Sequence, residues 1–177
     1  MPIAIMSLPR KKISVLGDYS VGKTSLVRRY VLNEFSSDYR ATVGVKAYRH
    51  QDQVTIDAKT FDIDQSIWDI EGSRFGEQLI RDYTLGSSGA LVVGDITRDD
   101  AILSMAGHAR RFLELLPGRP LVFALNKVDL LASKEQPSGQ ALSDEFGGQV
   151  VRTSALTGED VTMLFRTMLR RIVEIGA

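Results

Sequence analysis

Short segments without polar side chains are the feature that most constrains how this chain folds. Ala90–Val93 and Leu121–Leu125 are apolar throughout, and Ile13–Leu16 is interrupted only by Ser14. A strand that is apolar along its whole length is buried on both faces, which is typical of a parallel sheet covered by helices. We therefore predict an α/β fold with a mainly parallel sheet and helices on both of its faces.

Amphipathic helices are predicted between and after these strands. The first follows Gly22, and another covers residues around Ser138–Phe146. We expect a third to be capped by Asp100 and to bury the stripe Leu103, Ala106, Ala109, Phe112, Leu113 and Leu116. The clearest helical spacing of apolar residues comes last, at Val161, Leu164, Phe165, Met168, Leu169 and Ile172.

Two further extended segments predict an antiparallel hairpin. They cover Val45–Asp57 and Lys59–Trp68 and are separated by a tight turn around Ala58. A last short strand is predicted at Gln149–Thr153. In a sheet of this kind ligands bind beyond the carboxyl ends of the strands. Polar motifs that directly follow strands are therefore the candidates for a functional site.

Composition restricts the class of protein further. The 177 residues suit one domain, and 22 basic residues balance 22 acidic ones, so we expect no general affinity for nucleic acid. The chain has no cysteine, which excludes disulfides, cysteine-bound zinc and a prenyl or palmitoyl anchor on this chain. No apolar run approaches the ~18 residues of a membrane span. We expect a monomeric cytoplasmic protein, with His50 and His108 at its surface.

A glycine-bearing segment connects the first strand to the first helix. Its pattern, Gly17-x4-Gly22-Lys23-Thr24, is that of a phosphate-binding loop, in which glycines let backbone amides turn towards phosphate oxygens. The helix N-terminus adds its dipole. We expect Lys23 to reach the outer phosphates and the Thr24 hydroxyl to bind Mg²⁺. The loop predicts a nucleoside triphosphate ligand and leaves kinase, ATPase and GTPase activities open.

The segment Asn126-Lys127-Val128-Asp129 follows a buried strand and indicates which base is bound. We expect Asp129 to accept hydrogen bonds from the N1–H and 2-amino groups of guanine. Adenine offers neither donor and would leave the carboxylate unpaired, which is costly. Asn126 is expected to brace the surrounding loops, and the stem of Lys127 to lie over the base. This segment therefore favours guanine.

Three more segments contribute candidate residues. Asp69, after the strand that ends at Trp68, is expected to hold Mg²⁺ through water, and the Gly72 amide to approach the γ-phosphate. The Thr42 hydroxyl is expected to complete the metal's ligands when a triphosphate is bound. Residues 153–155 offer backbone amides to guanine O6.

Together these segments resemble the Ras superfamily of small GTPases. GDYSVGKT, Thr42 in ATVG, WDIEG, NKVD and TSAL occur in the family's order over residues 11–175, and WDIEG with DITRDD is most similar to the Rab branch. The resemblance implies a Ras-like G domain over residues 11–177, after an N-terminal extension of residues 1–10. It further implies a six-stranded sheet with one antiparallel strand, and bound GTP or GDP with Mg²⁺. Effectors, exchange factors and GTPase-activating proteins are expected to bind through switch segments at residues 35–45 and 69–84.

The resemblance also assigns roles to individual residues. Catalytic positions are Lys23, Thr42, Gly72 and Ser73, and metal positions are Thr24, Thr42 and Asp69. The nucleotide is expected to contact Asp18, Tyr19, Ser20, Val21, Gly22, Lys23, Thr24, Ser25, Phe35, Asn126, Lys127, Asp129, Ser154, Ala155 and Leu156. Among these, Phe35 matches the aromatic residue that family members stack on the guanine edge.

Three positions depart from the family's pattern. Ser73 stands where the family has a water-positioning glutamine. Its side chain is too short to orient water and contact the γ-phosphate together, so we predict slow unaided hydrolysis. Tyr19 replaces a small residue near the γ-phosphate, and Leu156 replaces the lysine of the SAK motif. Candidate substitutes for the glutamine are Glu71, Arg74, Glu77 or a residue of a partner.

More than one function is compatible with these residues. The leading hypothesis is a GTP-hydrolysing molecular switch, which the set Lys23, Thr24 and Asp69 favours. The alternative is a GTP-binding scaffold with negligible hydrolysis, which Ser73 and Tyr19 favour. A kinase has little support, because we find no arginine-rich lid for a phosphate acceptor.

Overall fold

The computed structural model describes residues 5–36, 44–70, 77–131 and 137–176. Its strands are β1 (Ile5–Leu16), β2 (Val45–Ile56), β3 (Lys59–Ile70), β4 (Gly89–Asp95), β5 (Leu121–Asn126) and β6 (Gln149–Thr153). Its helices are α1 (Lys23–Leu32), α2 (Glu77–Thr84), α3 (Ala101–Leu115), α4 (Gln140–Phe146) and α5 (Val161–Glu174), with a 3₁₀ turn at Val128–Leu130.

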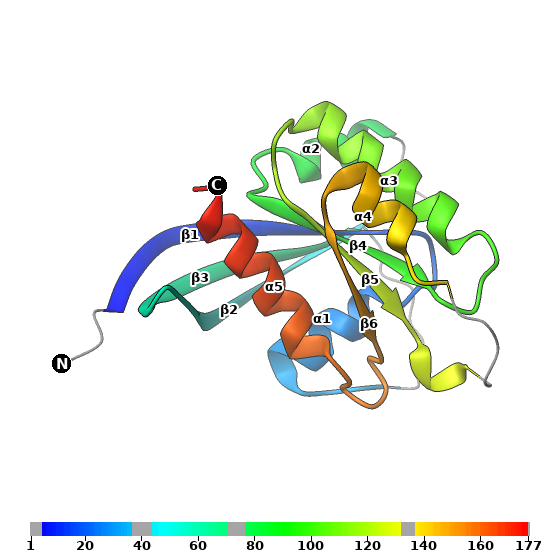
Figure 1. The fold of residues 1–177 in the computed structure, drawn as a ribbon, viewed down its shortest axis with the longest axis horizontal. Coiled ribbons are helices and arrows are strands. Elements are labelled where there is room, and N and C mark those ends of the chain that lie inside the picture. Colours follow the sequence, from blue (N-terminus) through cyan, green and yellow to red (C-terminus); the bar gives the residue numbers. More distant parts are fainter. Residues whose placement is uncertain (1–4, 37–43, 71–76, 132–136, 177) are drawn as a thin grey trace.

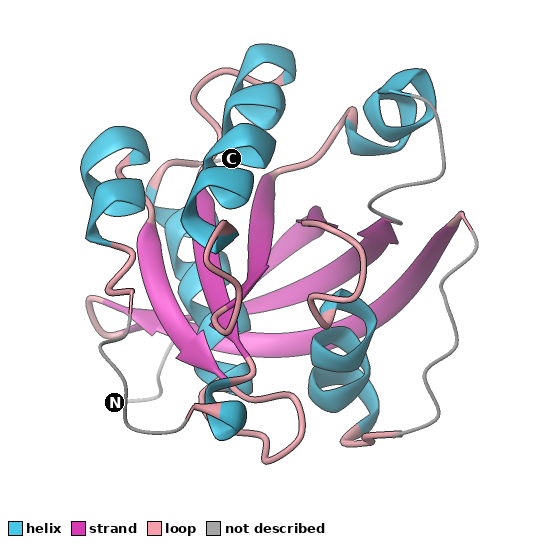
Figure 2. Ribbon diagram, turned by 90° about the vertical axis from the view of Figure 1, so that its right-hand side faces the viewer, coloured by secondary structure: helices cyan, strands magenta, loops and turns pink. Residues whose placement is uncertain are grey.

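The six strands form one sheet in the order β2-β3-β1-β4-β5-β6. The pairing of β2 with β3 is antiparallel, and the other four pairings are parallel. Helices lie on both sides of the twisted sheet (Figure 1 and Figure 2). The predicted fold class and the single antiparallel strand are therefore confirmed.

Each face of the sheet has its own apolar core. Leu91 and Val93 of β4 belong to the core that α1 and α5 cover. Ala90 and Val92, which alternate with them along the strand, belong to the core under α2, α3 and α4. All four side chains are at most 1% exposed, so a strand without polar residues is required here.

Strand β1 is longer than the sequence predicted. It begins at Ile5 instead of Ile13 and pairs in parallel with β3, from Ile5 opposite Thr60 onwards. The register shifts between Leu8 and Lys11, where Pro9 has no amide hydrogen to donate. Met6 and Ser7 are both exposed, so the first half of the strand has no alternating apolar pattern, and only the apolar second half was predicted.

Helix α3 buries the predicted stripe except at Leu103, and it buries Met105 in addition. Ala106, Ala109 and Phe112 are buried, and Leu113 and Leu116 are partly buried against the same core. Leu103 is 73% exposed, whereas Met105 is 1% exposed and packs towards β4. A Cβ atom at Gly94 would lie 2.3 Å from the Met105 sulfur, so that glycine makes room for the methionine. Leu103 and Met105 are two residues apart and therefore point to nearly opposite sides of a helix. The helix begins after Asp100 as expected, but the Asp100 side chain makes no capping hydrogen bond within the described residues.

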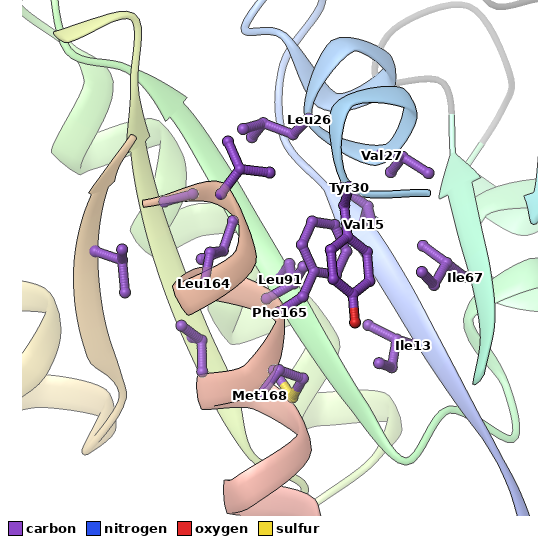
Figure 3. Close-up of a cluster of buried hydrophobic side chains, with 14 of the residues drawn as sticks. Ile13, Val15, Leu26, Val27, Tyr30, Ile67, Leu91, Leu164, Phe165 and Met168 are labelled. Atoms are coloured by element: carbon purple, nitrogen blue, oxygen red, sulfur yellow. The ribbon is translucent and has the colours of Figure 1, made fainter. Parts of the chain in front are cut away.

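Helix α5 confirms its predicted apolar face and shows how α1 is fixed to the sheet. All six predicted apolar positions of α5 are at most 1% exposed. Phe165 stacks on Tyr30 of α1, with ring centroids 4.0 Å apart and planes 4° from parallel (Figure 3). The contact fixes the position of α1, whose N-terminus starts at Lys23.

We expect Phe165→Ala to destabilise the protein by about 3–5 kcal/mol, because it removes a fully buried ring and leaves a cavity beside Tyr30. Denaturant unfolding measures the change. Met163→Ala is the matched control on the same helix, since Met163 is 49% exposed; we expect a change below about 0.5 kcal/mol. Equal effects of the two substitutions would contradict this packing.

Candidate nucleotide-binding site

Residues 17–22 form a loop between β1 and α1 whose shape depends on two glycines. Gly17 and Gly22 have φ angles of 144° and 101°. A Cβ atom at Gly17 would lie 2.2 Å from the Val93 carbonyl oxygen, and one at Gly22 would lie 2.3 Å from Asn126 Nδ2. Side chains at either position would clash with the ends of β4 and β5. The glycines of the motif therefore let this loop approach the rest of the site closely.

The Lys23 ammonium lies within the same loop. Lys23 is 8% exposed, and its Nζ donates to the carbonyl oxygens of Gly17 at 2.9 Å and Asp18 at 2.6 Å. A positive charge held beside the N-terminus of α1 provides electrostatic attraction for an anion. This position suits the predicted role of Lys23 at the phosphates.

Thr24 and Asp69 lie together as the metal prediction requires. The Thr24 hydroxyl donates to Asp69 Oδ2 at 2.5 Å, and Asp69 is fully buried at the end of β3. Mg²⁺ prefers oxygen ligands and commonly binds one or two protein groups together with phosphate oxygens and water. Among the described residues, no group of three or more histidine, aspartate or glutamate side chains could hold a metal alone. The pair therefore fits an ion shared with a nucleotide.

The Asn126 side chain joins three segments of the site. It is 1% exposed, and its Nδ2 donates to the Val21 carbonyl at 3.0 Å. Its Oδ1 accepts from the Thr153 hydroxyl and from the Ala155 amide, both at 3.2 Å. This is the bracing arrangement that the sequence predicted. The Ala155 amide, which the sequence assigned to guanine O6, is bonded to Asn126 in this structure.

The Lys127 side chain extends between the phosphate loop and β4. Its Nζ donates to the Ser20 carbonyl at 2.8 Å and to Asp95 Oδ2 at 2.6 Å. Burial opposes ionisation of Asp95, but hydrogen bonds from Lys127 and from the hydroxyl and amide of Thr97 outweigh it. The pKa of Asp95 is therefore lower than usual for an aspartate. Asp95 is the last residue of β4 and comes shortly after the apolar run Ala90–Val93, which is the signal that could have identified it.

The guanine-selective candidate Asp129 is oriented by the loop after β6. Asp129 lies on the 3₁₀ turn Val128–Leu130, and its Oδ1 accepts a hydrogen bond from the Ser154 hydroxyl. The same hydroxyl oxygen accepts from the Thr157 amide at 3.1 Å. One carboxylate oxygen of Asp129 is thereby fixed before any base is bound.

Helix α3 contacts the phosphate loop at Asp18, which the sequence did not predict. The Ser104 hydroxyl and His108 Nε2, the latter at 2.9 Å, bond to the Asp18 carboxylate. Burial opposes its ionisation, but these hydrogen bonds and the charges of His108 and Arg98 outweigh it, and the pKa of Asp18 is lowered. The His108 side chain is 15% exposed, so it lies at the surface only in part. The four-residue spacing of Ser104 and His108 places both on one side of α3, but it does not indicate that their partner is Asp18.

The other candidate residues lie around this centre or outside the described part of the chain. Tyr19 and Phe35 are each 38% exposed, Leu156 is 48% exposed, and Ser25 lies in the first turn of α1. Candidates outside the described residues are Thr42, Gly72 and Ser73, together with Glu71 and Arg74.

We expect Asp95→Asn to lower the free energy of unfolding at pH 7 by about 1–3 kcal/mol, because it removes the charged partner of Lys127. The lowered pKa of Asp95 means that this stabilisation is complete only above about pH 5, where the aspartate is ionised in the unfolded chain too, and that it is lost as the pH falls through the folded-state pKa. The difference between wild type and variant should therefore shrink from pH 5 to pH 3. Urea unfolding at several pH values measures it, with Asp99→Asn, at an exposed position, as control. A difference that is independent of pH would contradict the assignment.

Comparison with known proteins identifies the family to which this chain's sequence belongs. The Ras family model matches residues 12–174. Ras-related protein RABA2c of Arabidopsis thaliana is 32% identical over 167 residues, which cover 93% of this chain and 75% of that protein. Ras-related protein Rab-25 of Homo sapiens is 30% identical over 164 residues, or 91% and 75% of the two chains.

Ras-related protein Rab11A of Lotus japonicus is 31% identical over 171 residues, which cover 93% of this chain and 72% of that protein. Among the residues that the structure describes, no helix is both long and apolar enough to span a bilayer. The match to the family model extends over nearly the whole chain and includes every segment of the site described above. The chain therefore belongs to the Ras family and is a small GTPase similar to the Rab proteins.

Proposed function

We propose that this chain is a cytoplasmic molecular switch that binds GTP and GDP and hydrolyses GTP slowly with Mg²⁺. The position of the Asn126 side chain carries this proposal. It bonds to Val21 in the phosphate loop and to Thr153 and Ala155 in the loop that holds Asp129 in place. One buried amide therefore supports both the loop proposed to bind the phosphates and the loop that orients Asp129. A single nucleotide site requires these two loops to be held close together.

The residues of the chain divide the work of binding. The loop amides and the Lys23 ammonium are proposed to bind the phosphates, and Asp129 the N1–H and 2-amino groups of guanine. Phe35 is proposed to cover the base edge, and the backbone of residues 154–156 to lie beside the guanine O6. Positioning of this kind supplies most of the catalysis in phosphoryl transfer.

Thr24 and Asp69 fit a magnesium ion, with Thr42 as the third protein group in the triphosphate state. When bound, the ion neutralises charge on the phosphate oxygens. The Thr42 hydroxyl and Gly72 amide are proposed to engage the γ-phosphate side of the site and to be released after hydrolysis. Partners that recognise the GTP state are proposed to bind through residues 35–45 and 69–84.

We expect Asp129→Asn to weaken GDP binding on the order of 10²–10⁴-fold, because one carboxylate acceptor becomes an N–H donor that faces a guanine donor and the other loses its negative charge. Xanthosine diphosphate should bind the variant better than it binds the wild type, since an asparagine amide can donate to its 2-oxo group. Calorimetry measures the dissociation constants of GDP and xanthosine diphosphate for the wild type and the variant.

The matched control is Asp144→Asn on α4, whose carboxylate accepts from Gln140 away from this site. Its affinity for GDP should equal that of the wild type. If Asp129→Asn also retained wild-type affinity for GDP, position 129 would not read the base.

We expect Ser73→Gln to accelerate single-turnover GTP hydrolysis on the order of tenfold or more, because the longer amide can orient the attacking water. Phosphate release after mixing with Mg²⁺ and GTP measures the rate. Ser73→Ala should match the wild type. No phosphate release by the wild type over hours, with or without activating proteins, would instead support the GTP-binding scaffold.

A further inference from the structure

An arginine of α1 lies against the loop between β6 and α5. Arg29 Nε donates to the Ala155 carbonyl at 2.9 Å, and one terminal nitrogen of Arg29 donates to the Leu156 carbonyl at 2.7 Å. Figure 1 shows α1 beside this loop, although more than 120 residues separate them in the sequence. One planar guanidinium thus holds two consecutive carbonyl groups of the proposed base-reading loop.

The same guanidinium also approaches the proposed aromatic cover of the base. Its central carbon lies 6.0 Å from the centroid of the Phe35 ring, which is within the range of a cation–π contact. At Gly158, where φ is +87°, a Cβ atom would lie 3.7 Å from Arg29 Cδ. Arg29 therefore contacts the loop at residues 155–156 and lies near two other parts of the proposed site, Gly158 and the ring of Phe35.

Fixing a carbonyl also fixes the amide of the next residue. The peptide group is planar and trans, so its N–H points opposite to its C=O. Because Arg29 holds the Ala155 carbonyl, it orients the Leu156 N–H to the other side of that peptide. The Ala155 N–H already donates to Asn126 Oδ1, so the Leu156 amide is the better candidate to meet an oxygen acceptor on a base.

The Leu156 side chain offers no polar group for this task. It is apolar and 48% exposed, so only the backbone of residue 156 can recognise a polar atom. Backbone recognition by a surface loop requires that the loop be held in one conformation before the ligand binds. The Arg29 side chain, from α1, bonds to the carbonyl groups of both residues 155 and 156.

We propose that Arg29 is a positioning residue for recognition of the guanine C6 oxygen, acting through the backbone at Ala155 and Leu156. The inference rests on the proposed guanine-nucleotide site and adds a specificity determinant outside its sequence motifs. Arg29 does not touch the base through its own hydrogen-bonding groups. It aligns the amide that does.

The test compares three nucleotides that differ at single positions of the base. GDP has the C6 oxygen and the 2-amino group, 6-thio-GDP replaces the oxygen by a weaker sulfur acceptor, and IDP lacks the 2-amino group. Dissociation constants are measured by calorimetry in Mg²⁺ for the wild type and for Arg29→Ala. We expect the preference for GDP over 6-thio-GDP to fall roughly three- to tenfold in the variant. The preference for GDP over IDP, which Asp129 sets, should change less than twofold.

Two further variants separate positioning from structure. Arg28→Ala removes the neighbouring arginine, whose terminal nitrogen bonds to Glu34 at 2.8 Å, and should leave both preferences unchanged. Arg29→Lys keeps a positive charge in the last turn of α1 but lacks the planar fork. It should recover only part of the C6 preference, and it replaces Arg29→Ala as the test if that variant does not fold by circular dichroism.

The outcomes are distinct. If a folded Arg29→Ala variant binds all three nucleotides more weakly by the same factor, Arg29 only stabilises the domain and the inference is overturned. Unchanged affinities overturn it as well. Failure of the wild type to bind GDP refutes the proposed function itself, and the inference with it, whereas a wild type that binds GDP without any C6 preference refutes the inference alone.

Discussion

The buried amide of Asn126 is the interaction on which the rest of the site depends. It bonds to the phosphate loop at Val21, to Thr153 at the end of β6 and to Ala155 in the loop after that strand. A buried amide without partners would be unfavourable, so these hydrogen bonds together fix the position of the Asn126 side chain. The absence of a side chain at Gly22 is part of the same arrangement, since a Cβ atom there would occupy the position of the amide nitrogen. Two motifs that are distant in sequence therefore form one physical unit.

Two neighbouring elements of the fold support that unit. Helix α3 contacts the phosphate loop through Ser104 and His108 at Asp18. Strand β4 contributes Asp95, which holds the Lys127 ammonium beside the Ser20 carbonyl. Each contact pairs a charged group near the carboxyl ends of the parallel strands. Ligands bind beyond these strand ends in folds of this kind. Hydrogen bonds to the carboxylates of Asp18 and Asp95 therefore help to hold the loops of the site beside the apolar core.

The local sequence pattern predicted those features that depend on neighbouring residues. Continuous apolar strands, the loop at residues 17–24 and the spacing of α5 all follow from short-range rules, and the structure has them. Leu103 was misplaced because leucine and methionine are equally apolar, so only the space at Gly94 decides that Met105 is the buried one. The contacts of Asp18 with His108 and of Arg29 with Ala155 join residues 90 and 126 positions apart. No local periodicity encodes such pairs, and they became visible only in the folded chain.

The proposed switch requires one site that binds a guanine nucleotide with magnesium. Calorimetric titration of GDP into nucleotide-stripped protein in Mg²⁺, with folding verified by circular dichroism, tests it most directly. We predict a saturable heat of binding at one nucleotide per chain, and none on titration of ADP under the same conditions. Folded protein that gives no heat with GDP, or equal heats with GDP and ADP, would contradict the account.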